Sequence, residues 1–495
     1  MELQFEKTGW PCLTTATAQA KSEEQTQEVR LGDHMPDIGR VLAVWGQVLL
    51  RGKEWRSSGI TVSAGVMTWV LYAPEDGSEP RLLENWLPVH LKWEFPETKH
   101  DGVILTNCQL SSVDARSVSG RKLMIRAVVS AFAEAVVPES VDVWSPGQVP
   151  EDVQLLKRSY PVLLPREAGE KSFALDEEWQ MPVPVARLIY YRMQPEILDT
   201  NVVAGKAVFR GNAMFHILYE DTDGKLNAVD QEYPFSQFAD LDRDYDTDAL
   251  VRVVPAVTNL EVDLEEPDRL RMKAGIVGQF VVSDHCVMEV VEDAYSNRRP
   301  VTVQQASLML PTELDRSNST LRMAAEEPLE TERIVDSVFL CGQPRIRREE
   351  DGVLLQQEGG FQLLYESAGE LKGIVVHAEG ELGVKAGDDT TVRACARPFG
   401  NLQISLSKNQ ASLRTDVSLT SVSTTEQGIP MVMGLSLGEL TQPDPNRPSM
   451  ILRRSGGAAL WELAKGNGST VELITQINHL QGEPDEDQLL LIPVS

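Results

Sequence analysis

The sequence predicts a mainly β protein, with three tandem antiparallel β-sandwich-like repeats followed by a small C-terminal βααβ module. Two observations predict the repeats: one short motif recurs at nearly constant spacing, and apolar residues alternate with polar ones inside each copy, which is typical of half-buried strands. A third observation, a change to helical periodicity after residue 448, predicts the separate module at the C-terminus.

The recurring motif is a pair of aliphatic residues and a tyrosine before an acidic, glycine-containing turn. Its copies are Val70-Leu71-Tyr72, Ile217-Leu218-Tyr219 and Leu363-Leu364-Tyr365, so the tyrosines lie 147 and 146 residues apart. An arginine precedes each tyrosine by 32 residues, at Arg40, Arg187 and Arg333. This register favours internal duplication. We interpret these residues as fold determinants, with each tyrosine hydroxyl bonded to a buried partner, rather than as a threefold catalytic site.

Within each copy the strands are expected to be antiparallel. Leu260, Val262 and Leu264 alternate with acidic residues, as a strand with one buried face requires. Turn sequences such as Glu75-Asp76-Gly77 join consecutive strands. No copy contains the helical crossover of about 10 to 15 residues that a parallel sheet needs, so each copy is predicted to be an antiparallel sandwich.

The sequence between the copies is rich in Pro, Glu, Ser and Asn, which we interpret as linkers with short helical or extended pieces. Residues 153–157 are an apolar piece of the first linker that we expect to pack on a neighbour. The expected organisation is an N-terminal segment at 1–30, repeats at 31–145, 179–295 and 328–442, linkers at 146–178 and 296–327, and the C-terminal module at 443–495.

The C-terminal module is predicted to follow a proline-punctuated linker at 443–448. Leu460, Leu463 and Ala464 share one helical face. Ser-Thr-Val-Glu at 469–472 matches a capping box and predicts a second helix that ends at Asn478. Gln-Leu-Leu-Leu-Ile-Pro at 488–493 is typical of a terminal strand. In so small a module we expect Trp461 to belong to the core rather than to a contact surface.

Composition restricts the partners. The formal net charge of the 495 residues is −28, which opposes binding to nucleic acid or anionic lipid and favours a basic protein partner. The five cysteines are scattered without CxxC spacing, which predicts buried or free thiols in a reducing compartment. The N-terminus lacks the pattern of a signal peptide, and no stretch reaches the about 20 apolar residues of a membrane helix. We therefore expect a cytoplasmic chain without integral membrane association.

Three motifs that could carry chemistry have structural interpretations. Gly-Leu-Ser-Leu-Gly at 434–438 fits G-x-S-x-G, but too few residues follow for the helix of a nucleophile elbow, so we expect Ser436 to be catalytically idle. The alternating aspartates at 240–248 lack the Gly and Glu of a calcium loop and predict a solvated acidic loop. Asp284-His285-Cys286 has no second Cys or His nearby, and the seven histidines lack metal-ligand spacing. We expect no catalytic residue, no cofactor and no metal.

The sequence resembles two known families. Leu-Trp-x-Leu-Ala-Lys at 460–465, Ser-Thr-Val-Glu at 469–472, Ile-Asn-x-Leu at 477–480 and Leu-Leu-Ile-Pro at 490–493 resemble a LysM domain in order and spacing. The three repeats, with Pro-Asp-Ile-Gly-Arg-Val-Leu at 36–42, resemble the SPOCS domain of spore-coat proteins of Firmicutes. Several SPOCS copies followed by one LysM domain are similar to the architecture of a family of spore-coat morphogenesis proteins.

This resemblance implies a non-enzymatic scaffold in spore-envelope assembly. It implies a location in the cytoplasm of the mother cell, at the forespore surface, and binding of the coat morphogenetic ATPase through the LysM-like domain, together with contacts to other coat proteins. The alternative is a LysM protein of the cortex or cell wall that binds peptidoglycan or chitin-type glycans.

The resemblance also identifies candidate site residues. In glycan-binding LysM domains two loops form the groove, and they correspond here to Gly457, Ala458, Ala459 and Leu460 and to Asn478, His479, Leu480 and Gln481. The Gly-Asp-Thr or Gly-Asp-Ser turn of those domains is Gly-Ala-Ala here. We therefore expect these loops to bind a protein, with an apolar centre at Leu460 and Leu480 and an acidic rim at 483–487.

Overall fold

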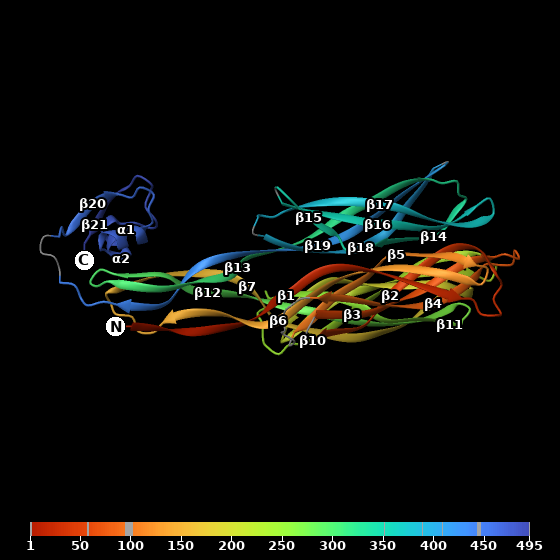
Figure 1. Cartoon of the computed structure of the whole chain (residues 1–495), viewed down its shortest axis with the longest axis horizontal. Coiled ribbons are helices and arrows are strands. Elements are labelled where there is room, and N and C mark those ends of the chain that lie inside the picture. Colours follow the sequence, from red (N-terminus) through yellow and green to blue (C-terminus); the bar gives the residue numbers. More distant parts are fainter. Residues whose placement is uncertain are drawn as a thin grey trace.

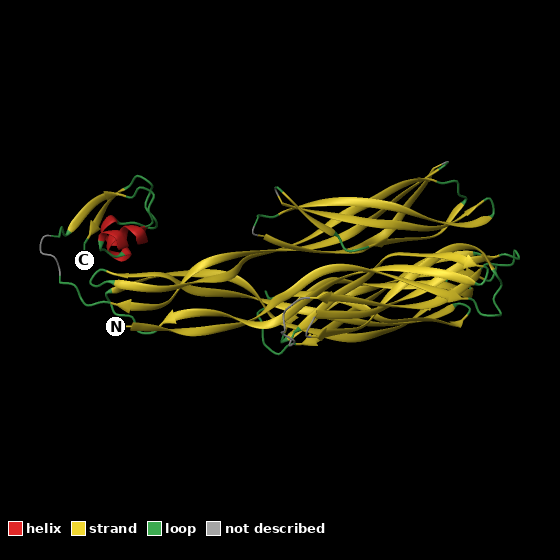
Figure 2. Ribbon diagram, viewed as in Figure 1, coloured by secondary structure: helices red, strands yellow, loops and turns green. Residues whose placement is uncertain are grey.

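The computed structural model describes residues 2–56, 59–94, 102–350, 352–388, 390–407, 409–442 and 447–494, so most of the predicted linker at 443–448, like His100, lies outside the described residues. The molecule is elongated and mainly β, as predicted (Figure 1). Three lobes lie at one end, a stem of long strands continues from them, and a small module with both helices lies at the other end, near the two chain ends (Figures 1 and 2).

Lobe 1 consists of two antiparallel sheets packed face to face. Its strands are β1 (Glu2–Arg30), β2 (Ile38–Arg56), β3 (Gly59–Pro74), β4 (Arg81–Glu94), β5 (Val103–Ser119) and β6 (Lys122–Pro146). The first sheet has the order β2-β3-β4, and the second joins β1, β6 and β5. Alternating apolar side chains of both sheets, such as Val62, Val66 and Ala131, are fully buried in a shared core.

Lobe 2 has the same succession of strands. They are β7 (Val153–Gln180), β8 (Val185–Val203), β9 (Lys206–Asp221), β10 (Leu226–Asp240), β11 (Leu250–Glu266) and β12 (Arg269–Ser296). The sheets have the orders β8-β9-β10 and β11-β12-β7. Phe209 and Phe215 from the first sheet pack with Ile276 from the second in one core.

Lobe 3 follows the same order with one interruption. Its strands are β13 (Val301–Pro328), β14 (Arg333–Cys341), β15 (Arg345–Glu349), β16 (Gly352–Ser367), β17 (Glu370–Lys385), β18 (Thr390–Ser407) and β19 (Gln410–Leu437). β14 and β15 pair with the same strand, β16. They are separated at Gly-Gln-Pro 342–344, where the proline cannot donate a ladder hydrogen bond. Phe361, Leu413 and Leu419 belong to the core of this lobe.

The three repeated tyrosines occupy corresponding places in these lobes. Each lies in the middle strand of a first sheet, and its partners across the ladder are Val41 for Tyr72, Leu188 for Tyr219 and Ile334 for Tyr365. A register shift follows each of these partners. The matching pairings are what a duplicated unit requires; the duplication itself stays a prediction.

The segments expected to be an N-terminal tail and two linkers are strands. They form β1, β7 and β13, which open the second sheet of their lobes and run beside β6, β12 and β19 along almost their whole length. Of the two expected alternatives, short helical or extended pieces, the structure shows the extended one. Over the lobes each of these strands has one ladder neighbour, and natural edge strands carry the prolines and charges that made the segments resemble linkers.

The stem is formed by the ends of the same three strand pairs, at residues 5–15 with 136–146, 153–164 with 284–296, and 301–310 with 427–437. Their inward side chains share one core, which includes Cys12, Leu164, Met288, Leu310 and Met431. Residues 2–4 of β1 also pair with 434–436 of β19, so the first strand of the chain joins the last strand of lobe 3. The stem therefore ties the three lobes together.

The C-terminal module contains β20 (Met450–Arg454), α1 (Leu460–Asn467), α2 (Val471–Asn478) and β21 (Leu489–Pro493), which confirms the predicted element order. α2 is capped by Thr470, whose Oγ1 accepts a hydrogen bond from the Leu473 amide; the predicted capping box would have used Ser469. Gly468 ends α1 in the left-handed conformation, at φ 65°. Both helices have eight residues, and no helix among the described residues is long and apolar enough to cross a membrane.

Candidate functional site

The module is held against the tip of the stem through α1. Trp461 Nε1 donates a hydrogen bond of 2.8 Å to Asp293 Oδ2 of β12, and Lys465 Nζ lies 2.6 Å from the same oxygen. The ring of Tyr295 packs edge-on against Trp461 at 4.8 Å between centroids, and its hydroxyl donates to the Ser469 carbonyl. Trp461 is 9% exposed, so it is buried as predicted, although at a junction between the module and the stem.

Asp293 is the polar centre of this junction. Burial opposes its ionisation, but the hydrogen bonds from Lys465 and Trp461 outweigh burial and lower the pKa of the carboxyl below its ordinary value. Leu156, in the segment predicted to pack on a neighbour, lies against the apolar core of the module. The contact thus combines an ion pair, two aromatic rings and an aliphatic side chain.

The first predicted loop is only partly a surface. Gly457 has φ 74°, its N–H donates to the Glu486 carbonyl, and it is exposed, as is Ala459. Ala458 is half-buried. Leu460 is 5% exposed and belongs to the module core, so it cannot form an exposed apolar centre. Its amide donates to the Glu483 carboxylate, which gives that expected rim residue a structural role at the start of α1.

The second predicted loop contains one residue that holds the module together. Asn478 donates from Nδ2 to the Leu491 carbonyl and accepts from the Leu491 amide at Oδ1, so it bonds the free edge of β21. His479 caps α2 with φ 56° and is exposed, Leu480 is half-buried against the core, and Gln481 is exposed. The structure brings both loops into one module, and their binding of a partner stays a prediction.

A second polar cluster, which the sequence analysis missed, joins the three lobes. Trp45 of lobe 1 donates from Nε1 to Asp336 Oδ2 of lobe 3 over 2.7 Å. His216 of lobe 2 lies 2.8 Å from Asp336 Oδ1 through Nε2 and 2.7 Å from Asp230 Oδ1 through Nδ1. Asp336 is 3% exposed and His216 is 8% exposed. The signal in the sequence was a polar residue inside an apolar strand segment, as in Phe215-His216-Ile217.

The electrostatics of this cluster favour an ion pair. Burial disfavours the imidazolium, but the carboxylates of Asp336 and Asp230 outweigh burial and raise the pKa of His216 to about 9. Burial likewise opposes the charge of Asp336, while His216 and Trp45 lower its pKa. At neutral pH the histidine is therefore protonated and donates to both carboxylates.

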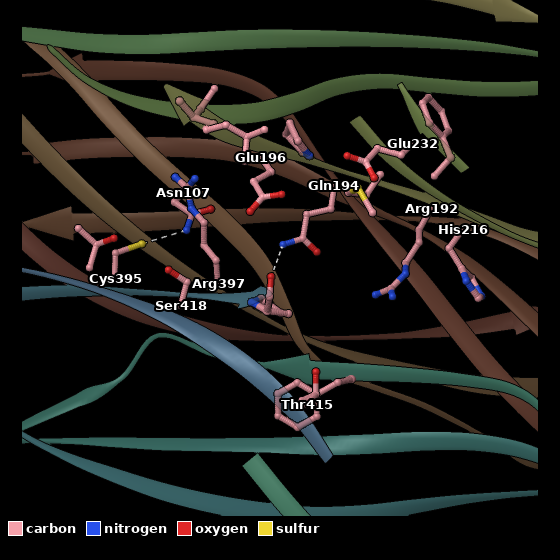
Figure 3. A pocket seen from close by; sticks show the side chains of 18 of the residues that line it. Asn107, Arg192, Gln194, Glu196, His216, Glu232, Cys395, Arg397, Thr415 and Ser418 are labelled. Carbon is pink, nitrogen blue, oxygen red and sulfur yellow. Dashed lines mark hydrogen bonds between the residues drawn. The ribbon is translucent and has the colours of Figure 1, made fainter. Parts of the chain in front are cut away.

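A cleft of about 1170 Å³ lies beside this cluster, between the first sheet of lobe 2 and parts of the other two lobes (Figure 3). Gln194 donates to the Pro398 carbonyl across it, and Asn107 Nδ2 lies 3.1 Å from Cys395 Sγ. Glu134 of lobe 1 also lines it and pairs with Arg252 of lobe 2 and Arg393 of lobe 3. Because these lining residues bond the lobes to one another, we interpret the cleft as part of the junction between the lobes.

The repeated arginines link the lobes in a closed ring. Arg40 donates to the Leu371 carbonyl of lobe 3, Arg187 to the Pro80 carbonyl of lobe 1, and Arg333 to the Leu226 carbonyl of lobe 2. Each acceptor lies at or just before the start of the last strand of a first sheet. Among the tyrosines, the buried Tyr72 donates to the carbonyl of Pro36 over 3.1 Å, although Pro36 is half-buried rather than the buried partner that was predicted.

The remaining motifs have plain structural surroundings. Ser436 lies in β19, paired with Thr302 and Glu2, and no helix follows it directly, so the geometry of a nucleophile elbow is not formed there. The aspartates at 240–248 are exposed, as predicted. All five cysteines are free. Within the described residues no group of three or more His, Cys, Asp or Glu is placed to hold a metal ion.

Comparison with known proteins gives one match. Residues 184–265 match the family model described as SipL, SPOCS domain. These residues span β8, β9, β10 and nearly all of β11, which is the first sheet of lobe 2 and one strand of its second sheet. The match supports the SPOCS part of the resemblance and suggests a sporulation-related protein. Neither a curated protein nor a solved structure matches the chain.

Proposed function

We propose that this chain is a non-enzymatic scaffold in spore-coat assembly. It works in the mother-cell cytoplasm at the forespore surface, binds a coat morphogenetic ATPase through its C-terminal module and contacts other coat proteins through its lobes. The observation that carries the proposal is the match of residues 184–265 to the SPOCS domain of SipL. The order of lobes and module agrees with the architecture that the LysM and SPOCS resemblances imply.

The arrangement of the molecule is suited to this role. The lobes and the module lie at opposite ends of the stem, so two partners bound at the two ends would be kept apart (Figure 1). Several weak docking surfaces on one chain raise the local concentration of each partner for the others and give avidity that no single surface has. The net charge of −28 favours basic partners over nucleic acid or anionic membranes.

The glycan-binding alternative finds less support in the module. The loop at 457–459 offers methyl groups where glycan-binding LysM domains have hydrogen-bonding side chains, and Asn478 already bonds the backbone of β21. Isothermal titration of the full chain with peptidoglycan and chitin oligomers tests it. Micromolar binding would favour this alternative.

Affinity capture tests the scaffold proposal. The full chain and a chain that ends at Gln442 are each incubated with the purified coat morphogenetic ATPase. We expect the full chain to capture the ATPase and the shortened chain to capture at least about tenfold less, because the proposed docking module is missing.

The control for the shortened chain is its fold. Its circular dichroism spectrum and the unfolding of its lobes should resemble those of the full chain, since the cores of the lobes contain no residue of the module. Equal capture by both chains, or no capture by either, would contradict the proposal.

A further inference from the structure

One face of the module's two-stranded sheet exposes four apolar side chains beside Arg454, which lies opposite Leu489 in the ladder. Its members, here called the sheet face, are Met450, Leu452, Leu489 and Leu491, with exposed fractions of 44%, 61%, 54% and 41%. Leu489 and Leu491 share one side of β21 because Leu490 and Ile492, which alternate with them, are fully buried in the module core. Met450 and Leu452 of β20 lie on the same side by the register of the ladder. Leu452 and Leu491 lie directly opposite each other in the ladder.

Such a cluster differs from scattered surface residues. Single exposed leucines are ordinary on a protein surface, whereas adjoining large aliphatic side chains on a short pair of strands form a patch that marks an interaction site. The helices lie on the opposite side of the sheet, toward the stem, so the sheet face is directed away from the lobes (Figure 2). Docking of α1 on Asp293 therefore leaves this face open.

An acidic loop borders the sheet face at the start of β21. Asp485, Glu486 and Asp487 are exposed and lie just before Leu489 in the chain. The backbone of this loop is held in place, because Ser455 Oγ donates to the carbonyls of Asp485 and Glu486 over 2.5 and 2.7 Å. The side chain of Asp487 is 89% exposed, and its contact with Arg454 is long, at 3.9 Å. The loop thus presents fixed negative charge beside an apolar patch.

We propose that the sheet face and this acidic loop together bind a basic amphipathic segment of a partner protein. The apolar side of the segment covers Leu452 and Leu491, and its Lys or Arg side chains meet the carboxylates at 485–487. The inference rests on the proposed function, because it names the surface through which the module would bind the coat ATPase. It moves that surface from the predicted loops to the sheet.

A second copy of the chain is the less suitable occupant. Two sheet faces packed together would place two equally acidic loops on one small interface, and would bring together two chains of net charge −28. Four side chains also fall well short of the about 800 Å² per partner of a stable interface. A basic segment gains from the same charges that oppose self-association.

The test uses the full chain and two purified probes, the coat morphogenetic ATPase and a synthetic amphipathic Leu/Lys peptide. We expect Leu452→Asp with Leu491→Asp to weaken the binding of both probes by about tenfold or more. Asp485→Lys with Asp487→Lys should weaken binding and reduce its salt dependence. The matched control is Val287→Asp with Met309→Asp, which places the same two charges on stem residues that are 64% and 53% exposed, and it should bind like the unchanged chain.

The outcomes separate the inference from the proposed function. If the ATPase binds the folded Leu452→Asp, Leu491→Asp chain as tightly as the unchanged chain, the inference falls and the proposed function stands. If the peptide requires the sheet face but the ATPase does not bind the full chain, the inference stands and the proposed function falls. A change in the sedimentation of the chain alone on Leu452→Asp, without loss of peptide binding, would assign the face to self-association and also overturn the inference.

Discussion

His216 and Asp336 show how single polar residues can determine where whole lobes meet. His216 stands between two apolar residues and Asp336 follows Val335. Together with Trp45 they make contacts that no lobe could make alone. Burying such a pair has a desolvation cost that its own attraction barely offsets, whereas removal of one partner leaves an uncompensated buried charge. The cluster therefore penalises arrangements of the lobes that separate its members.

The first prediction concerns alkaline pH. Because the folded-state pKa of His216 is raised from 6.5 to about 9, its stabilisation is complete below about pH 6.5 and is lost as pH rises through 9. We expect the free energy of unfolding of the unchanged chain to fall by up to about 3 kcal/mol between these values. His216→Gln should be less stable at pH 6.5 and should lose this pH dependence in urea titrations.

The control for this experiment is His285→Gln, which removes an exposed histidine from β12. It should keep the pH profile of the unchanged chain. A profile that stays flat in the unchanged chain between pH 6.5 and 9 would refute the assignment of a protonated His216.

The second prediction concerns Asp336. Asp336→Ala leaves the His216 imidazolium with the half-exposed Asp230 alone, and it removes the acceptor of Trp45. We expect a loss of about 3 to 5 kcal/mol in the free energy of unfolding and a lower pKa of His216, measured by NMR titration. Trp45→Phe removes one hydrogen bond to a charged group and should cost less, about 1.5 to 3 kcal/mol. Equal stability of Asp336→Ala and the unchanged chain would be inconsistent with a buried ion pair.

At the scale of elements, periodicity predicted strands with alternating side chains, including the edge strand β11, and failed for the edge strands β7 and β13. The middle strands β3, β9 and β16 were marked by alternation and by the tyrosine motif. β7 and β13 were interpreted as linkers. An edge strand contacts few apolar neighbours, so its sequence shows a weak apolar pattern, and its charges and prolines resist aggregation. Strand identity there comes from the partner strand, which local sequence does not reveal.

The candidate site was predictable to a similar degree. Short helical periodicity located α1 and α2, since the turn glycines and the capping threonine are local signals. Burial of Leu460 and docking of Trp461 on Asp293 depend on residues that are distant in the chain, and no local pattern carries that information. The exposed face of β20 and β21 became visible only once their pairing was known.

The third prediction concerns the attachment of α1 to the stem. Asp293→Ala removes the acceptor of both Trp461 and Lys465, so the contact loses two hydrogen bonds to a charged group. We expect faster hydrogen exchange at the backbone of 460–467, while the lobes keep their protection. Asp487→Ala, at an exposed residue of the same module, is the matched control and should leave exchange in α1 unchanged. Unchanged exchange in Asp293→Ala would show that the contacts of Tyr295 and Leu156 are sufficient to hold the module.

At the scale of the whole molecule, the ring of arginine contacts and the shared stem make the three lobes one cooperative unit. The core of lobe 1 includes Tyr190 of lobe 2 and Leu364 of lobe 3. Each lobe also receives an arginine from another lobe, and the stem core contains side chains of all three strand pairs. Separate lobes would open independently, whereas linked lobes should open together. Rigidity of this kind suits a scaffold that must hold partners at a set separation.

The fourth prediction tests this cooperativity. Arg187→Gln combined with Arg333→Gln breaks two of the three ring contacts, each of which we expect to contribute about 1 kcal/mol. Calorimetry should then show a broader unfolding transition, or two transitions in place of one. Arg347→Gln, which removes an exposed pair with Glu349 inside lobe 3, serves as the control. A single sharp transition in the double variant would show that the ring contacts are not needed to couple the lobes.

Closure of the ring also sets an order of events during synthesis. Arg40 can form its hydrogen bond only after Leu371 has been synthesised, 331 residues later. At a translation rate of about 5 to 20 residues per second, this delay is roughly 17 to 66 seconds. Residues 2–4 wait even longer for their partners at 434–436. Until lobe 3 is synthesised, lobe 1 lacks these partners, and nascent chains stalled before lobe 3 would display its unpaired surfaces to chaperones and proteases.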